Sequence, residues 1–78
     1  MSLHINHKVF GEFDVNIDEA ENRLDSYKFA LVILYYGTGM TLKELAQDSD
    51  IYWGESRSIE GIRSQLSTAV RYLRWDKA

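Results

Sequence analysis

Apolar and polar residues alternate over the first 17 positions, in two stretches at residues 3–10 and 13–17. A period of two is typical of β-strands with one buried face. Gly11-Glu12 lies between the stretches, so we expect an N-terminal β-hairpin that turns there. An isolated hairpin is only marginally stable in water, and its apolar face must pack on other elements. That face is expected to contain Leu3, Ile5, Val9, Phe13, Val15 and Ile17.

Helical spacing of apolar residues begins after the hairpin. Asp18 resembles an N-terminal cap, which predicts a first helix over residues 19–36. The alternative is a start at Asp25-Ser26, with residues 19–25 as a loop before a shorter helix, because those residues are polar except for Ala20 and Leu24. Residues 29–36 are apolar on every side, the pattern of a central helix that other elements cover. Gly37-Thr38-Gly39 is expected to end this helix.

Thr41-Leu42-Lys43-Glu44 has the pattern of a capping box and predicts a second helix of about two turns. Its buried side is expected to contain Leu42, Leu45 and Ala46. An irregular stretch should follow from Asp48 to Ser56, around Trp53.

Ser58 is expected to cap a third helix, which carries one apolar stripe and one polar arc. The stripe contains Ile59, Ile62, Leu66, Ala69, Val70 and Leu73. The opposite arc contains Glu60, Arg63, Ser64, Ser67, Thr68, Arg71 and Arg74.

Together these elements predict one α+β domain over residues 1–78 that is mostly α-helical, with a small β-hairpin at 1–17 and a three-helix unit at 18–78. A chain of 78 residues buries only about 60% of its unfolded surface, so its stability margin should be thin. The core is expected to include Leu31, Leu34, Leu45, Ile62 and Leu66.

The order of elements, the capping box from Thr41 to Leu45 and the basic segment from Arg57 to Arg74 resemble helix-turn-helix transcription regulators. The resemblance covers residues 9–74 and is greatest to winged-helix types with amino-terminal strands, such as response-regulator output domains. It implies that the third helix enters the major groove of DNA and that the second helix braces it. A wing after the third helix is not expected, because only residues 75–78 follow it.

Charge is segregated along the chain. Residues 1–56 hold four Lys/Arg and ten Asp/Glu, a net charge of −6, whereas residues 57–78 hold five Lys/Arg and two Asp/Glu, a net charge of +3. Arginine side chains engage phosphates or guanine edges, and short hydroxyl residues let a helix approach a groove. The same arc is also compatible with a solvated helix face, and Glu60 would repel phosphate. The candidate DNA-binding residues are Arg57, Arg63, Ser64, Ser67, Thr68, Arg71 and Arg74.

Double-stranded DNA is therefore the partner that we expect first, with a homodimer as a further expectation because one small module contributes limited contact area. The alternative is a protein-binding module or inhibitor that docks through its acidic front and exposed aromatic side chains. Core filling is the competing interpretation for Trp53. The candidate residues for protein interaction are Tyr52, Trp53, Trp75, Glu12, Asp14 and Glu19.

No other motif indicates chemistry. The chain has no cysteine, which argues against disulfides and thiolate metal sites and fits a reducing cytoplasm. Its longest apolar run, at residues 29–36, is far below the roughly 20 residues of a membrane span, and we expect no signal peptide. His4 and His7 would point to opposite faces of a strand, which argues against a shared metal. We therefore expect no enzyme activity, metal or cofactor.

Overall fold

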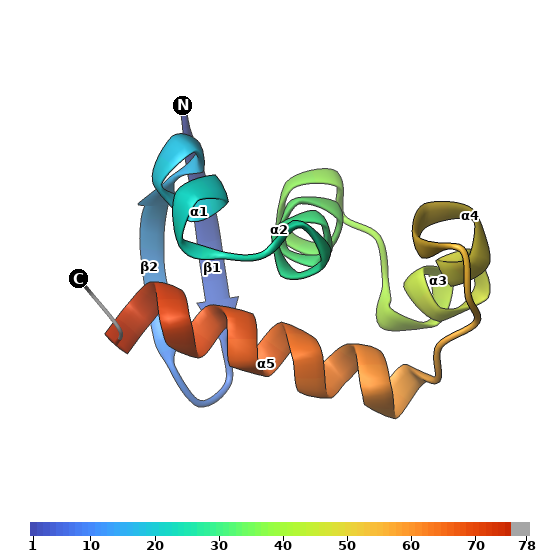
Figure 1. Cartoon of the computed structure of the whole chain (residues 1–78). Helices are drawn as coiled ribbons and strands as arrows, with labels where there is room; N and C mark the ends of the chain where they lie inside the picture. Colours follow the sequence, from blue (N-terminus) through green and yellow to red (C-terminus); the bar gives the residue numbers. More distant parts are fainter. Residues whose placement is uncertain (76–78) are drawn as a thin grey trace.

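The computed structural model describes residues 1–75, which form a two-stranded hairpin packed against a helical body (Figure 1). The fold is α+β and mostly helical, as the pattern predicts. The elements are β1 (Ser2–His7), β2 (Gly11–Asn16), α1 (Ile17–Arg23), α2 (Ser26–Val32), the π-helix η1 (Ile33–Thr38), α3 (Leu42–Gln47), α4 (Ser49–Trp53) and α5 (Ile59–Trp75).

The hairpin is antiparallel, with Leu3 opposite Val15 on its inner face. Its turn lies at residues 8–10, so the expected turn at Gly11-Glu12 is wrong. Gly11 instead opens β2 at φ +83°, a left-handed conformation that favours glycine. Val9, expected on the buried face, lies in the turn and is 74% exposed. Alternation of residue types gave no indication of where β1 ends.

The expected single helix over residues 19–36 is wrong. The alternative start at Asp25 is confirmed, but the preceding residues, which that alternative expected to be a loop, form the helix α1. Leu24 is extended, at φ −114° and ψ 150°, and separates α1 from α2. Asp25 caps α2, because its carboxylate accepts from the Lys28 backbone N–H at 2.8 Å. Asn16 caps α1 in place of Asp18. The expected three-helix unit is therefore divided more finely within the described residues, into five α-helices and η1.

Helix α2 runs without a break into η1, where the hydrogen bonding widens to the π pattern. Gly39, at φ +86°, ends this helix as expected, and its N–H donates to the carbonyl of Leu34. Leu34 lies in the widened turn and is only half-buried, unlike the other four residues predicted for the core.

The capping box of α3 is confirmed. The Glu44 backbone N–H donates to Thr41 Oγ1 at 3.1 Å, and the Thr41 N–H donates to Glu44 Oε1 at 2.9 Å. The bonds from Thr41 hold the pKa of the Glu44 carboxyl below its ordinary value. The stretch from Asp48 to Ser56, expected to be irregular, instead contains the short helix α4, which ends at Gly54 with φ +75°.

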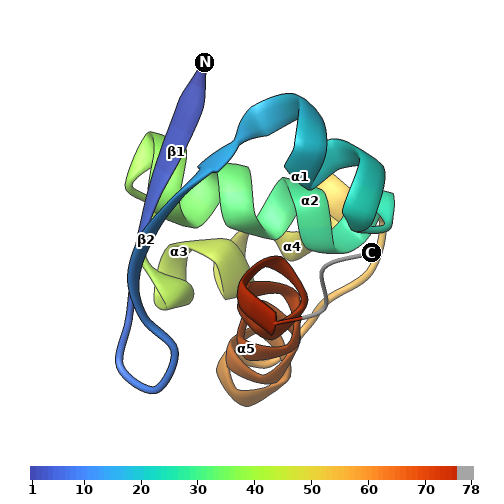
Figure 2. The ribbon, with the colours of Figure 1, turned by 90° about the vertical axis from the view of Figure 1, so that its left-hand side faces the viewer.

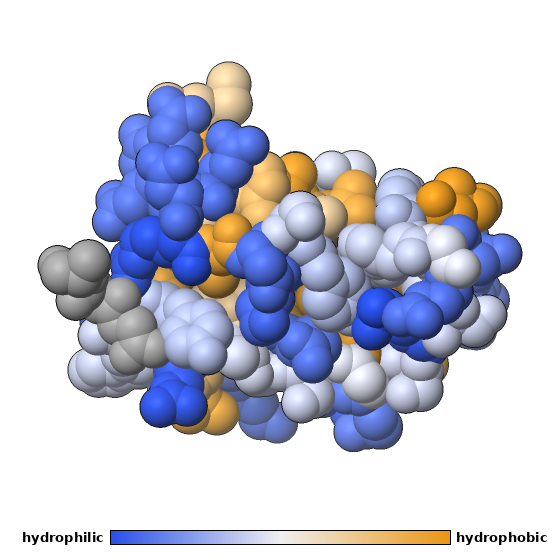
Figure 3. All heavy atoms as spheres, in the orientation of Figure 1, coloured by the Kyte–Doolittle hydropathy of each residue, from blue (hydrophilic) through white to orange (hydrophobic). Residues whose placement is uncertain are grey.

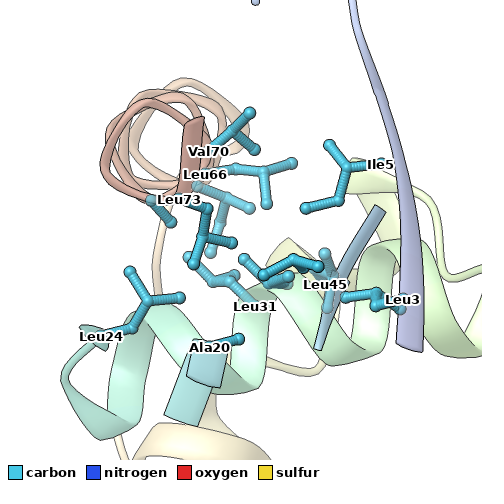
Figure 4. Packing of buried hydrophobic residues seen from close by; sticks show 13 residues of the cluster. Leu3, Ile5, Ala20, Leu24, Leu31, Leu45, Leu66, Val70 and Leu73 are labelled. Carbon is cyan, nitrogen blue, oxygen red and sulfur yellow. The ribbon is translucent and has the colours of Figure 1, made fainter. Parts of the chain in front are cut away.

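Helix α5 begins where Ser58 Oγ accepts from the Gly61 N–H at 3.0 Å, as expected. Its stripe packs against α2, α3, α1 and the hairpin, and Figure 4 shows Leu66 and Val70 directed towards Leu31 and Ile5. Ile59, at the start of the stripe, is exposed. The stripe residues that are buried are Ile62, Leu66, Ala69, Val70 and Leu73.

Figures 1 and 2 both have the tip of the hairpin and α5 on the same side of the molecule, opposite α1 and α2. The hairpin is therefore a neighbour of the polar side of α5 as well as part of the core. Within residues 1–75, no helix is long and apolar enough to cross a membrane.

Leu66→Ala tests the core. We expect a loss of about 2–5 kcal/mol in the free energy of unfolding, because the substitution removes a buried side chain and leaves a cavity. Urea denaturation followed by circular dichroism measures this loss. Val9→Ala is the control and should stay within about 0.5 kcal/mol of wild type, since Val9 is exposed in the turn. Equal midpoints for the two variants would contradict the packing of α5 described above.

Thr41→Ala tests the cap of α3. The free energy of unfolding should fall by about 1 kcal/mol, because the Glu44 backbone N–H at the helix start loses the Thr41 hydroxyl as its acceptor. Ser64→Ala, on the exposed face of α5, should be neutral or slightly stabilising, because alanine has the higher helix propensity. If Thr41→Ala behaves like Ser64→Ala in denaturant, the capping box contributes nothing measurable.

Candidate nucleic-acid interface

One flank of α5 faces the hairpin and gathers four of the predicted site residues. Arg63, Ser67, Arg71 and Arg74 follow one another at intervals of three or four residues, so they share one side of the helix. Ser67 Oγ lies 3.3 Å from Nε2 of His7, and the Arg74 guanidinium lies 5.2 Å from the ring centroid of Phe13. We call these four residues the α5 flank.

Ser64 and Thr68, the two remaining hydroxyl candidates on α5, differ in whether their hydroxyl groups are free to contact DNA. Ser64 is exposed on the surface next to the α5 flank. Thr68 is half-buried, and its hydroxyl donates to the Ser64 carbonyl at 3.1 Å, so this group is already used within the helix. Glu60, which sequence reasoning expected to repel phosphate, forms an ion pair with Arg63. Both partners are largely exposed to solvent, and Arg63 is therefore available to exchange partners.

Arg57 is separated from the other candidates. It precedes α5, and its guanidinium lies 4.2 Å from the ring centroid of Tyr27 and 2.5 Å from Glu55 Oε1. Arg57 Nε and the Tyr27 hydroxyl are buried without a hydrogen-bond partner among the described residues. Burial raises the pKa of Tyr27, and the positive charge of Arg57 opposes that change. Arg57 thus contributes to the packing of the α4–α5 connection.

Ser49 fixes the same connection, and sequence reasoning missed it. Its buried hydroxyl donates to the Ala46 carbonyl at 2.8 Å and accepts from the Arg57 backbone N–H at 2.8 Å. The residue types at Asp48-Ser49-Asp50 indicated a loop, and nothing in that pattern showed which serine would be buried. The bridge from Ser49 holds the chain where it enters α5.

A groove runs beside the α5 flank. It consists of two adjoining hollows of about 440 Å³ and about 610 Å³, which share Tyr35, Leu42 and Arg63 as lining residues. Lys8 lines the first hollow and Lys43 the second, and neither hollow has an Asp or Glu in its lining. We call this hollow surface the α5 groove.

The floor of the α5 groove is aromatic. The rings of Tyr35 and Tyr36 meet edge to face, with centroids 4.9 Å apart. Burial, together with the neighbouring Tyr35, raises the pKa of Tyr36 to about 12, so this hydroxyl stays neutral at physiological pH. Sequence reasoning missed the groove, because both tyrosines belong to the apolar run that predicted a covered helix.

Several carboxylates of residues 1–56 have a histidine or a cation as partner. His4 on the outer face of the hairpin contacts Asp14 Oδ1 at 2.8 Å and Glu12 Oε2 at 3.1 Å, and these bonds raise the pKa of His4. Glu19 pairs with Arg23 at 3.5 Å. Asp25 pairs with Lys28 at 2.9 Å. Within residues 1–75, Lys8, Lys43, Arg71 and Arg74 form no ion pair with a carboxylate.

The candidates for protein interaction do not form one surface. Tyr52 and Trp53 belong to α4, at the opposite end of the molecule from Trp75 (Figure 1). Trp53 is half-buried and packs edge to face on Tyr27 with centroids 5.0 Å apart, which confirms its role in the core. Trp75 is 63% exposed and is the last residue of α5, whose C-terminal end lies near the hairpin in Figure 1. Strand β2 of the hairpin carries Glu12 and Asp14.

An apolar patch lies at the surface over α4 (Figure 3). Its main side chain is Ile51, which is 77% exposed, and Tyr52 beside it is 44% exposed. Blue and pale atoms cover most of the rest of the face in Figure 3, with further orange atoms between the hairpin and α2.

No protein-family model, curated protein or solved structure matches the chain. Its function is therefore inferred from the arrangement of its own residues.

Ser49→Ala tests the bridge that holds the start of α5. The substitution leaves the Arg57 N–H and the Ala46 carbonyl without the hydroxyl, and the free energy of unfolding should fall by about 1–3 kcal/mol. Ser56→Ala is the matched control, because Ser56 is exposed in the same connection. Thermal and urea unfolding of both variants provide the comparison. If the Ser49 variant is as stable as the Ser56 variant, the hydrogen bonds of Ser49 do not stabilise the connection to α5.

Proposed function

We propose that the protein binds double-stranded DNA with α5 in the major groove. The observation that carries this proposal is the distribution of cations that lack a carboxylate partner within residues 1–75. Arg71 and Arg74 belong to the α5 flank, and Lys8 and Lys43 line the α5 groove beside it. Cations without a protein partner are the ones that a phosphate neutralises with release of counterions, so they dominate affinity for DNA.

The dimensions of α5 suit this role. Its 17 residues span about 25 Å, and the major groove is about 12 Å wide and admits an α-helix. Ser64 and Ser67 are short enough to permit close approach, while Arg63 reaches a phosphate or a guanine edge. Helix α3 packs against α5 and braces it, as the first helix of a helix-turn-helix pair does, with α4 in the connection.

Lys8 and Lys43 extend the contact beyond α5. Lys8 lies in the turn of the hairpin, near the middle of the α5 flank, and Lys43 lies nearer the start of α5. Both are exposed and are suited to phosphate contacts that fix the orientation of the helix. Because one module of this size offers limited contact area, the proposal includes a homodimer whose two copies bind adjacent half-sites.

Charge reversal at matched positions tests the proposal. Arg71→Glu should weaken binding to a mixed-sequence duplex about tenfold or more, because a phosphate contact becomes a repulsion. Lys28→Glu changes the net charge equally. Because Lys28 lies on α2 and is already paired with Asp25, this variant should lose far less affinity for the duplex. Fluorescence anisotropy at two salt concentrations measures both variants. Circular dichroism melts check that both remain folded.

Two outcomes would contradict DNA binding. In one, the wild-type protein shows no salt-dependent binding at low ionic strength. In the other, Arg71→Glu and Lys28→Glu reduce affinity equally, which would indicate that only net charge matters.

A protein partner is the second candidate, and the exposure of Ile51, Tyr52 and Trp75 is the observation that favours it. Under this hypothesis the Arg71 variant is nearly silent. Association with the partner then falls after Trp75→Ala or Tyr52→Ala, or after charge reversal at Glu12, Asp14 and Glu19.

A further inference from the structure

His7 joins the turn of the hairpin to α5. It is the last residue of β1 and is half-buried on the inner side of the strand, away from the exposed His4. Its Nδ1 lies 3.0 Å from the backbone nitrogen of Val9 and 3.3 Å from that of Phe10. Its Nε2 lies 3.3 Å from Ser67 Oγ on α5. The Phe10 ring packs on the imidazole, with centroids 5.0 Å apart.

These contacts determine the tautomer of His7. A backbone N–H only donates, so Nδ1 must offer a lone pair to Val9 and Phe10 and carry no proton. The proton of the neutral ring is therefore on Nε2, which donates to Ser67 Oγ. The neutral imidazole thus accepts the hydrogen bonds of the turn at Nδ1 and donates a hydrogen bond to the α5 flank from Nε2.

We propose that neutral His7 is a latch for the hairpin turn, and that uptake of a proton at Nδ1 releases the turn from its arrangement beside α5. The added N–H would face the two N–H donors of Val9 and Phe10, so both bonds are lost. The turn carries Lys8. The position of this cation on the proposed DNA surface therefore depends on pH. This consequence rests on the proposed function, whereas the latch itself does not.

The charged side chains that line the hollow around the latch are cations. Lys8 on the hairpin and Arg63 on α5 line the same hollow as His7, and both are cations. Helix η1 contributes Tyr35 and Tyr36 to this hollow and α3 contributes Leu42, and no Asp or Glu lines it. The carboxylates of Glu12 and Asp14 bind His4 on the outer face, and Glu60 on α5 pairs with Arg63.

Burial lowers the pKa of His7 below its ordinary value of 6.5. The folded state therefore prefers the neutral ring more strongly than the unfolded chain does. The stabilising contribution of His7 is complete above the unfolded pKa, and it is lost as the pH falls through the folded pKa. His4 behaves oppositely, because its pKa is raised by Asp14 and Glu12: its contribution is present just below the unfolded pKa, while those carboxylates are ionised, and is lost as the pH rises through the folded pKa.

Nitrogen-15 NMR of the whole chain tests the latch without DNA. At about pH 7.5 the His7 ring should be the Nε2–H tautomer. As the pH falls, its ring should titrate below pH 6.5, and the Val9 and Phe10 amide resonances should shift with the same midpoint. His4 should titrate above pH 6.5 and leave those two amides unchanged.

Two variants sharpen the measurement. In His7→Asn, the amide oxygen replaces Nδ1 as acceptor for the turn but does not titrate, so the Val9 and Phe10 amides should lose their pH dependence. Ser67→Ala keeps the turn bonds and removes the contact to α5, so the titration of the amides should persist. An Nδ1–H tautomer in the wild-type protein, or Val9 and Phe10 amides that do not follow His7, would overturn the latch.

Binding to the duplex is measured separately at about pH 7.5 and about pH 5.5. Protonation also adds a positive charge to this surface, so the displacement of Lys8 must outweigh that charge. The wild-type protein should then lose severalfold more affinity at the lower pH than His7→Asn does, and a gain in affinity would contradict the link to DNA binding. Coupled amide shifts without DNA binding at either pH would contradict the proposed function and leave the latch intact. DNA binding without coupled amide shifts would overturn the latch alone.

Discussion

The packing of the α5 stripe is the constraint on which the other features of the molecule depend. Ile62, Leu66 and Val70 are buried against α2, α3 and the hairpin, so α5 has a single orientation about its own axis. The polar residues between them must then face outward. Because the inner face of the hairpin is buried in the same core, the hairpin and the α5 flank lie side by side (Figures 2 and 4).

Polar side chains decide how the remaining chain is divided. Asn16, Asp25 and Thr41 each accept from backbone N–H groups and begin a helix, while Gly39 ends one. Helices of six or seven residues are not stable alone in water, so α1, α2 and α3 depend on the core that α5 completes. The caps set where the helices begin, and the core provides the free energy that keeps them formed.

Folding also rearranges the charges. In the sequence, Lys8 and Lys43 are minor members of an acidic segment with ten Asp/Glu. In the structure, several of those carboxylates are occupied by His4, Arg23 and Lys28, whereas the two lysines line the α5 groove. A protein with a net charge of −3 therefore presents a cationic surface next to α5. His7 lies within that surface, where burial favours its neutral form.

The sequence by itself determined the fold class, the capping box at Thr41, the end of the helix at Gly39 and most of the α5 stripe, because these features depend on local periodicity and backbone chemistry. It did not determine the turn at residues 8–10, because the alternation of residue types does not mark the end of β1. It did not determine the break at Leu24 either, because the two possible helix starts were close in strength. Only the tertiary structure removed Arg57 from the candidate interface and brought Lys8, Lys43 and His7 to α5. Those relations join residues far apart in the chain, and only the packing of the shared core sets the distances between them.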